Sequence, residues 1–416
     1  MQADIVVLGA GIVGVSSALH LQAAGLRVVL LDRAAPGSGT SHGNAGLIER
    51  SSIVPYAFPR SPLRLARYAL NREPDVRYNP LHLPRMAGWL ARYWHHSAPA
   101  PLAEATAAMW PLIQRCVSEH DALIEAAGLH HLIGGRGWIE LFRTPQAFAQ
   151  AQREAQSLAA YELKFAALNH AALTQLQPGI SDRAVGALHW LEPKTVRDPG
   201  ALVRGYAQLF TQRGGVLVRG DALGLKPVED GWQVQGVRAK QVVVALGLQA
   251  GGLCERLGYR VPLAVKRGYH LHFAQPAHDP LEYSVCDSQS GFVLAPMARG
   301  IRLTTGVEFD AADAPANRIL LSRTEKLARQ LFALGEAVDA EPWLGCRPCL
   351  PDMRPVIGAA PGHAGLWFNF GHAHHGLTLG PVSGRLLAQL VTGQTPFTDP
   401  APYRATRFEG VARART

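Results

Sequence analysis

Hydrophobic residues along the chain follow two alternating spacings. Short apolar, β-branched runs predict buried strands at residues 4–8 and 27–31. Residues 12–24, between these runs, have apolar positions every three to four residues, which is the spacing of a helix with one buried face. The pattern therefore predicts that the chain opens with a strand–helix–strand unit.

The same two spacings continue to the C-terminus and predict a mixed α/β protein. Helices are expected at residues 101–127, 145–160, 198–213, 322–335 and 378–393, and strands at 137–142, 216–218, 232–246 (a hairpin and a buried strand) and 366–370. The stretch 259–309 is β-rich, and the proline-rich stretch 50–100 predicts an irregular excursion with short helices. Strands and helices interleave without an internal repeat, which favours a Rossmann-like α/β domain with a second, β-rich α+β domain.

A glycine motif joins the first strand to the first helix. Gly9 permits a tight turn, Gly11 lets the backbone approach a pyrophosphate, and Gly14 lets helix and strand pack closely. Asp32, 18 residues past Gly14, ends the second strand, where its carboxylate can accept hydrogen bonds from both ribose hydroxyls. This pattern predicts a dinucleotide site and disfavours NADP, but it does not separate NAD from FAD.

Two further segments favour a flavin. Residues 38–47 form a loop of small residues that is rich in backbone donors and follows the second strand. Near the other end, the strand 366–370 leads through Gly371 and His372 into a helix that starts at Gly376. A helix N-terminus carries partial positive charge, which suits the negative charge of a reduced flavin at N1 and O2.

With these motifs assembled, residues 4 to about 393 resemble the FAD-dependent D-amino acid oxidase and glycine oxidase superfamily, and within it the bacterial D-amino acid dehydrogenases. The resemblance rests on GAGIVG with Asp32, TSHGNAG, DPGALVRGYAQLFTQRGG, VVVALG, VKRGYHL, the segment 306–308, GCRPCLPDMRPVIG and GHAHHGLTLGP. It implies a discontinuous FAD-binding domain (1–80, 197–262 and 340–416) and a substrate-binding domain (81–196 and 263–339).

The resemblance also implies which residues form the site. Arg347 falls on the family's arginine that pairs with the substrate carboxylate, and Phe292, Tyr269, His374 and His375 fall on or near the substrate pocket; Phe292 lacks the hydroxyl of the tyrosine frequent there. The implied FAD-binding residues are Gly9, Ala10, Gly11, Ile12, Val13, Gly14, Asp32, Arg33, Thr40, Ser41, Gly43, Asn44, Ala45, Gly46, Leu47, Ala222, Ala245, Gly247, His372, Ala373, Gly376, Leu377 and Thr378.

Cys346 and Cys349, with the histidines at 372, 374 and 375, invite a metal-site interpretation. We expect no metal, because Arg347 and Pro348 fill the gap between the cysteines and a cation would repel Arg347. Some family members bond flavin through a nearby cysteine. The register of the two cysteines does not match those members, so we expect non-covalent FAD.

The expected activity is oxidation of a D-amino acid to an imino acid by hydride transfer from Cα to flavin N5, followed by hydrolysis to a 2-oxo acid and ammonia. Family members pass the electrons to a membrane quinone or to oxygen. Three alternatives stay open: oxidation of glycine or of a secondary or cyclic amine (sarcosine, proline or D-hydroxyproline), a non-catalytic flavin-binding subunit, and an NAD dehydrogenase.

Composition adds expectations about compartment and partners. Five cysteines among 416 residues are too few for a disulfide framework, and a strand predicted from residue 4 leaves no room for a signal peptide, so we expect a cytoplasmic protein. The net charge of +9 is mostly arginine, with 6 lysines and no nucleic-acid motif, which disfavours a nucleic-acid partner. The charge is concentrated in residues 55–96 and 401–416, and the first window interleaves arginines with aromatic residues. This window is therefore a candidate for peripheral contact with an anionic membrane.

Overall fold

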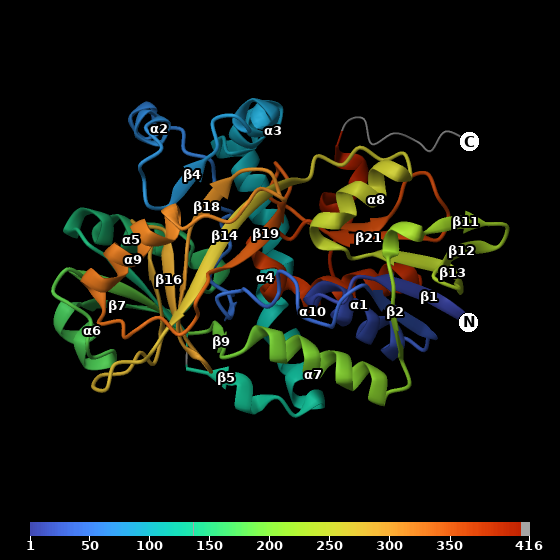
Figure 1. Ribbon diagram of the computed structural model, residues 1–416, viewed down its shortest axis with the longest axis horizontal. Helices are drawn as coiled ribbons and strands as arrows, with labels where there is room; N and C mark the ends of the chain where they lie inside the picture. Colours follow the sequence, from blue (N-terminus) through green and yellow to red (C-terminus); the bar gives the residue numbers. More distant parts are fainter. Residues whose placement is uncertain (136, 409–416) are drawn as a thin grey trace.

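The computed structural model describes residues 1–135 and 137–408, which form two units that lie side by side (Figure 1). One unit contains the N-terminus and an eight-stranded sheet, and the other contains a ten-stranded sheet. The predicted combination of an α/β unit and a β-rich unit is confirmed.

The eight-stranded sheet contains β1 (Gln2–Leu8), β2 (Val28–Asp32), β10 (Val216–Arg219), β11 (Lys226–Val228), β12 (Gly231–Val234), β13 (Val237–Val244), β20 (Val356–Ala359) and β21 (Leu366–Phe370). Its order is β10-β2-β1-β13-β12-β11, and the five strands β10, β2, β1, β13 and β21 run parallel. The long strand β13 pairs along one edge first with β12 and then with β21. The carboxyl ends of β1, β13 and β21 therefore lie next to one another, which is where open parallel sheets bind their ligands.

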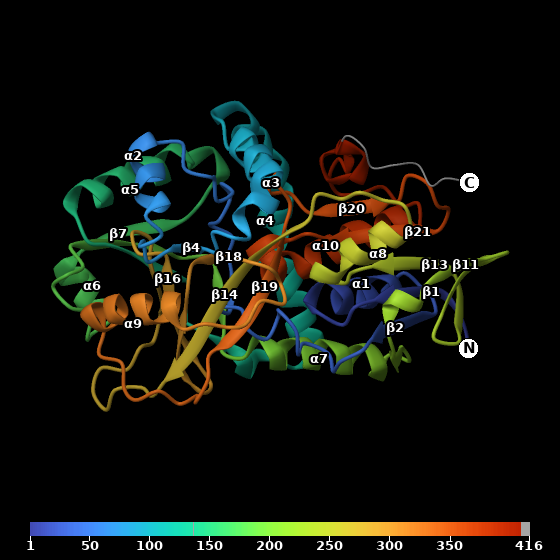
Figure 2. The same cartoon turned by 45° about the horizontal axis from the view of Figure 1, so that its top comes forward.

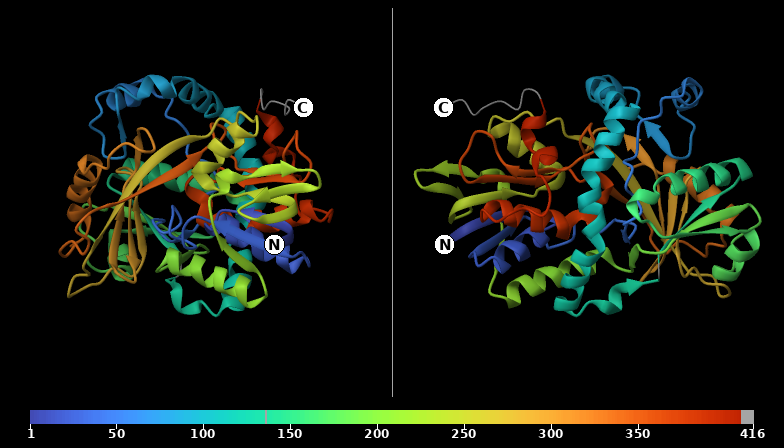
Figure 3. Two further views of the ribbon diagram at one scale, coloured as in Figure 1. Left: turned by 45° about the vertical axis from the view of Figure 1, so that its right-hand side comes forward. Right: turned by 180° about the vertical axis from the view of Figure 1, so that it is seen from behind.

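Both faces of this sheet are buried. Ile5 and Val7 of β1 pack under α1 (Ile12–Ala23), α4 (Pro99–Ala127), α7 (Pro199–Gln212) and α10 (Gly376–Val391), whereas Val6 and Leu8 pack with α8 (Ala250–Arg256). Burial on both faces explains why the strands read as uninterrupted apolar runs rather than as alternating ones. The helix α4 runs along the back of the molecule between the two units (Figure 3).

The helices α1 and α10 touch through two glycines. A Cβ on Gly380 would lie 2.8 Å from Ile12 Cγ1, and one on Gly384 would lie 2.9 Å from the backbone of Ser16. Any side chain at these glycines would separate the helices. Since Gly380 faces Ile12 and Gly384 faces Ser16, the two helices run in the same direction.

The ten-stranded sheet contains β4 (Val76–Tyr78), β6 (Trp138–Phe142), β7 (Phe165–Asn169), β8 (Gly186–Trp190), β14 (Ala264–Phe273), β15 (Ser284–Asp287), β16 (Phe292–Met297), β17 (Gly300–Thr304), β18 (Val307–Phe309) and β19 (Trp343–Cys349). Its order is β4-β18-β14-β17-β16-β15-β6-β8-β7, with β19 paired to β14. One face packs on α6 (His170–Leu176) and α9 (Ile319–Leu331), and part of the other packs on α5 (Pro145–Ser157). A small sheet of β3 (Leu47–Ile48), β9 (Lys194–Val196) and β5 (Ile133–Gly134) accompanies the two large ones.

The excursion that follows β3 contains α2 (Pro62–Ala69), β4 and α3 (Leu83–His96), and Figure 2 shows α2 and α3 as separate helices on the outside of the molecule. The excursion is anchored to the ten-stranded sheet by the pairing of β4 with β18. It is also anchored by α3, where Trp89 Nε1 donates to Pro262 O (3.1 Å) and the ammonium of Lys266 lies 3.9 Å from the ring centre of Tyr93. The expected short helices are confirmed, and β4 was not predicted.

Most predicted elements are present with shifted ends. The Asp198 side chain accepts from Ala201 N (2.8 Å) and caps α7, as expected. The helix predicted at 322–335 is α9, which begins at Ile319 and ends at Leu331. Of the ranges expected in the FAD-binding domain, β4 and β19 are strands of the ten-stranded sheet.

Candidate functional site

A cavity of about 1060 Å³ connects the two units. One end is formed by the glycine turn after β1, and its walls continue along the loop at residues 37–47 and the start of α10 to β19 and the excursion. The size fits a large cofactor together with a small substrate, since pockets for drug-sized ligands usually measure about 300–1000 Å³.

The glycine turn has the geometry of a dinucleotide site. Gly9 has a φ of +104°, and a Cβ there would lie 2.5 Å from Ala245 O. A Cβ on Gly14 would lie 1.7 Å from Gly9 O, so Gly14 permits close packing, as predicted, without lining the cavity. Ala10 N donates to Asp32 Oδ2 (2.6 Å), which fixes the carboxylate beside the turn. The start of α1 thus faces the cavity with its positive end.

The loop that follows β2 forms the next part of the wall. Thr40 Oγ1 donates to Cys346 O (3.1 Å), and Ser41 Oγ accepts from Ile12 N (3.1 Å). The Asn44 side chain accepts from Gly46 N (2.8 Å) and donates to His374 O (3.5 Å). The loop is therefore bonded at several points to both units.

The start of α10 forms the opposite part of the wall. The turn passes through Gly371 (φ +83°) and η5 (Ala373–His375) before α10 begins at Gly376. Thr378 Oγ1 donates to Leu47 O (3.1 Å) and accepts from Glu49 N (3.2 Å), which joins α10 to the loop. Helix end and loop, the two segments expected to contact the flavin, therefore lie on the wall of the same cavity.

Of the histidines at the start of α10, His372 and His375 are buried and His374 is half-buried, and the three differ in their partners. His372 Nε2 lies 3.1 Å from Ser383 Oγ, and burial lowers the pKa of His372 to about 3. Burial also holds the pKa of His374 well below its usual value, and the charges of Arg347 and Lys266 add to this effect. His374 is therefore neutral at physiological pH. His375 Nε2 lies 2.9 Å from Ser52 Oγ and 3.6 Å from Glu49 Oε2.

Arg347 lies on β19 with its guanidinium on the cavity wall. It donates to the carbonyl oxygens of Gly306 (2.9 Å) and Thr305 (3.2 Å), and among the described residues it has no carboxylate partner. It also covers Gly268, where a Cβ would lie 2.6 Å from Arg347 Nη2. Burial lowers the pKa of Arg347, but an arginine side chain stays protonated at physiological pH. The cavity therefore contains an oriented positive charge that is available to an anion.

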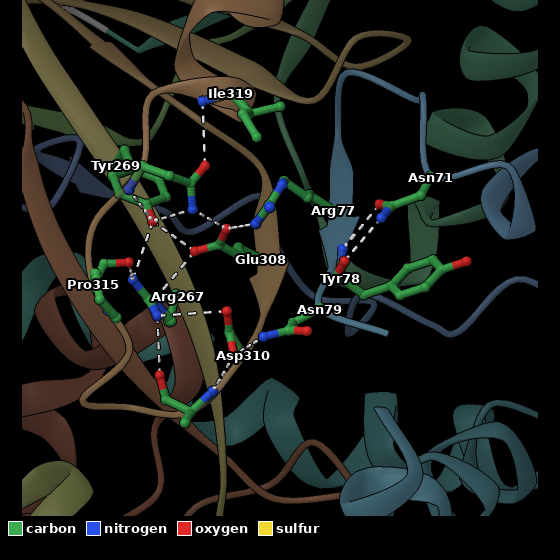
Figure 4. Close-up of polar contacts among 12 residues, drawn as sticks. Asn71, Arg77, Tyr78, Asn79, Arg267, Tyr269, Glu308, Asp310, Pro315 and Ile319 are labelled. Atoms are coloured by element: carbon green, nitrogen blue, oxygen red, sulfur yellow. Dashed lines mark hydrogen bonds and ion pairs between the residues drawn. The ribbon is translucent and has the colours of Figure 1, made fainter. Parts of the chain in front are cut away.

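The Tyr269 hydroxyl belongs to a buried polar network. It donates to Glu308 Oε2 (2.6 Å) and accepts from Arg267 Nη2 (3.1 Å), and Asn317 Nδ2 lies 3.3 Å away (Figure 4). Glu308 also pairs with Arg77 of β4, which links the network to the excursion. Tyr269 contributes to the cavity wall, but its hydroxyl is already bonded within the network.

Besides Gly14, three residues expected in the site do not lie on the cavity wall. Phe292 is 1% exposed and packs with Leu294 in the core under α9, because alternate residues of β16 face opposite sides of the sheet; its neighbour Val293 lines the cavity instead. Ala222 is buried in η3 (Ala222–Gly224) in the core beside α8. Gly46, with a φ of +75°, forms a turn in the loop but does not line the cavity.

The remaining expected residues all line the cavity, together with several that the sequence did not indicate. The Tyr56 ring centre lies 4.6 Å from that of His374, and Tyr56 is contributed by the excursion. Glu49, Glu140 and Lys266 also reach the wall. Lys266 pairs directly opposite Arg347 on β14 and β19, a register that only the structure gives.

The comparison with known proteins agrees with this geometry. A family model described as FAD dependent oxidoreductase matches residues 4–390. A D-amino-acid oxidase of Bradyrhizobium diazoefficiens is 30% identical over 423 residues, covering 97% of this chain and 98% of that protein. A D-amino acid dehydrogenase of Xylella fastidiosa (strain M23) is 30% identical over 408 residues, covering 93% and 91%. The structure of glycine oxidase from Geobacillus kaustophilus matches with a TM-score of 0.74 and 21% identity, covering 98% and 99%.

The described residues fit the cofactor that this family uses. Gly9 and Gly11 present backbone without side chains to the cavity, and two helix N-termini face it. No group of three or more histidine, cysteine or acidic side chains suited to a metal ion occurs among the described residues. Because the family model spans both units and not the dinucleotide turn alone, the whole chain belongs to the FAD-dependent oxidoreductase family and its cofactor is FAD, not NAD.

Proposed function

We propose that the protein oxidises D-amino acids to imino acids, which hydrolyse to 2-oxo acids and ammonia. The observation that carries this proposal is Arg347, a guanidinium on the cavity wall with carbonyl partners only. Its planar fork suits the two oxygens of a carboxylate. The D configuration is supported by the names of the two relatives at 30% identity.

In the proposed reaction, bound FAD supplies the hydride acceptor. Arg347 binds the substrate carboxylate and thereby fixes the direction of the Cα–H bond. The α-hydrogen leaves with both electrons, the lone pair of the amine forms the C=N bond, and one amine proton is released. Water then adds to the imine, and ammonia leaves. Most of the catalysis therefore comes from positioning of the substrate, and the proposed reaction uses no general base from the protein.

Burial of the site assists the chemistry on the substrate side. The reaction needs a neutral amine, and an enclosed pocket disfavours the ammonium form. Burial likewise raises the pKa of Glu140, which lies on the wall with Trp190 Nε1 3.2 Å from its carboxylate. Neutral His374 and the aromatic ring of Tyr56, which lie against each other, add two uncharged groups to the same wall.

The decisive experiment is anaerobic reduction of the bound flavin by a panel of D-, L- and cyclic amino acids, followed at the flavin absorption band. We expect D-amino acids to bleach the flavin faster than their L-forms, glycine, sarcosine or proline. Faster bleaching by a secondary amine would replace the proposed substrate class. A flavin that no amino acid reduces would instead support a non-catalytic flavin-binding subunit.

We further propose that the excursion rests on an anionic membrane surface, from which electrons pass to a quinone. Four of its arginines, Arg60, Arg72, Arg85 and Arg92, have no carboxylate partner among the described residues. Leu63, Leu70 and Leu81 of the same segment are 75%, 68% and 87% exposed. Exposed apolar side chains among arginines suit a surface of anionic lipids. Residues 409–416 of the C-terminal arginine-rich window lie outside the described residues.

No described helix is both long and apolar enough to cross a bilayer, so the proposed attachment is peripheral. The test is co-sedimentation with vesicles of phosphatidylcholine alone or mixed with phosphatidylglycerol. We expect binding only to the mixed vesicles, weakened by salt and by the double variant Leu63→Ser/Leu70→Ser. Equal recovery with both vesicle types would contradict the proposal. A matched control is Val216→Ser/Leu217→Ser on β10, which changes two exposed apolar residues outside the excursion.

A further inference from the structure

Arg302 is a buried cation behind the loop that follows β2. It lies on β17, is 3% exposed, and does not itself reach the cavity wall. Its Nη1 donates to the carbonyl oxygens of His42 (2.9 Å) and Asn44 (2.6 Å). One guanidinium nitrogen therefore holds two carbonyls of the loop that lines the cavity.

Arg302 is itself held by a chain of side chains that ends near the surface. Its Nε donates to His272 Nε2 (3.1 Å), and His272 Nδ1 donates to Asp339 Oδ2 (2.6 Å). Because Nε2 accepts, the proton of neutral His272 must be on Nδ1. Burial lowers the pKa of Arg302 to about 10, so the guanidinium remains charged at neutral pH.

The carbonyl bonds determine where the neighbouring N–H groups point. In a trans peptide the C=O and the next N–H point in opposite directions. With the carbonyls of His42 and Asn44 turned to Arg302, the N–H groups of Gly43 and Ala45 turn away from it. Gly43 and Ala45 both line the cavity, and among the described residues neither N–H has a hydrogen-bond acceptor.

Other side chains of the ten-stranded sheet hold the same loop. His270 of β14 stacks on Trp343 with ring centres 4.9 Å apart, and its ring centre lies 6.2 Å from that of His42 in the loop. The ring of Trp343 packs against Gly43 so closely that a Cβ there would lie 1.8 Å from Trp343 Cζ3. The loop can therefore approach a flat ligand with bare backbone, and its amides are oriented before the ligand binds.

We propose that Arg302 is a positioning residue for the flavin: it fixes the peptides after His42 and Asn44 so that their N–H groups face FAD and stabilise its negatively charged reduced form. Pre-oriented amide dipoles act on a charge that develops in the ligand without the cost of reorganisation. Arg302 acts only through the loop and does not touch the substrate. The proposal therefore does not depend on which amine is oxidised.

The test compares Arg302→Met with the unchanged protein in two measurements that do not need substrate. The first is the dissociation constant of FAD from the apoprotein, followed by quenching of flavin fluorescence. The second is the midpoint potential of the bound flavin. Since bonds from a charged donor contribute appreciably to stability, we expect FAD to bind about 10- to 100-fold more weakly. We also expect a lower potential, because the reduced form loses more stabilisation than the oxidised form.

Two further variants keep the test decisive if Arg302→Met folds poorly. Asp339→Asn removes the carboxylate that fixes the His272 tautomer and should shift both quantities in the same direction by a smaller factor. Arg302→Lys retains a charge but lacks the fork, so it should restore the two quantities only in part. The exposed Arg318→Met, which removes a pair with Glu341, is the matched control and should change neither.

Unchanged FAD affinity and potential in folded Arg302→Met or Asp339→Asn would overturn the proposal. Weaker FAD binding with an unchanged potential would also overturn it, since Arg302 would then shape the loop without directing its amides at the reduced flavin. Failure of amino acids to reduce the flavin would refute the proposed function alone and leave these two measurements intact.

Discussion

Replacement of Arg347 by leucine is expected to abolish most of the activity with little effect on FAD binding. A bidentate bond between a buried guanidinium and a carboxylate contributes about 3–5 kcal/mol when one partner is removed. At about 1.4 kcal/mol for each factor of ten, kcat/KM should fall by about two to three and a half orders of magnitude. The carbonyls of Thr305 and Gly306 also lose their donor, so stability should fall by about 1–2 kcal/mol.

The assay is stopped-flow reduction of the flavin under anaerobic conditions at a series of D-alanine concentrations. Arg347→Lys should keep part of the carboxylate binding, because an ammonium retains the charge but not the fork. The midpoint of thermal unfolding and the FAD dissociation constant report whether the variant is intact. A folded, FAD-loaded Arg347→Leu protein with kcat/KM within fivefold of the unchanged protein would refute the carboxylate role of Arg347.

Three other perturbations have defined outcomes. Gly14→Ala places a Cβ 1.7 Å from Gly9 O and should lower the unfolding temperature and release FAD, whereas Gly252→Ala on α8, which meets nothing within 4 Å and lies away from the cavity wall, should do neither; equal unfolding curves would contradict this. Burial lowers the pKa of His120 from 6.5 to about 4 in the folded protein. As pH drops, the unfolded chain therefore binds a proton at His120 before the folded chain does, and the free energy of unfolding falls between pH 6.5 and 4. His120→Gln should flatten this dependence in urea titrations at several pH values, and an unchanged slope would contradict it. Acid precipitation should leave all flavin in solution, and yellow colour in the pellet would show a covalent bond to the chain and contradict non-covalent binding.

The dinucleotide half of the molecule was predictable because its signals are local. The turn at Gly9, the cap at Asp198 and the apolar strands each depend on residues close in sequence. The start of α10 was also found, since a glycine turn and an apolar helix follow one another there. In such segments local preference and tertiary packing agree.

The substrate side was less predictable because its residues meet only through the sheet. Phe292 was expected on the wall, but the side of a strand on which a residue lies depends on register, and one position separates Phe292 from Val293. Tyr56 gave no signal in the sequence, since its place over His374 depends on how the excursion folds back. Arg302 had no motif of its own, and its partners are about 30 to 260 positions away in the chain.

The close parallel packing of α1 and α10 has a consequence for the cofactor as a whole. Gly380 is the residue of α10 that faces Ile12 at the start of α1, so α10 begins one turn, about 6 Å, beyond α1. Both positive helix ends therefore face the same cavity at a fixed offset. Because Gly380 and Gly384 hold the two helices together, a substitution that spreads them would move both helix ends relative to each other, and we expect it to weaken FAD binding as a whole rather than at one end.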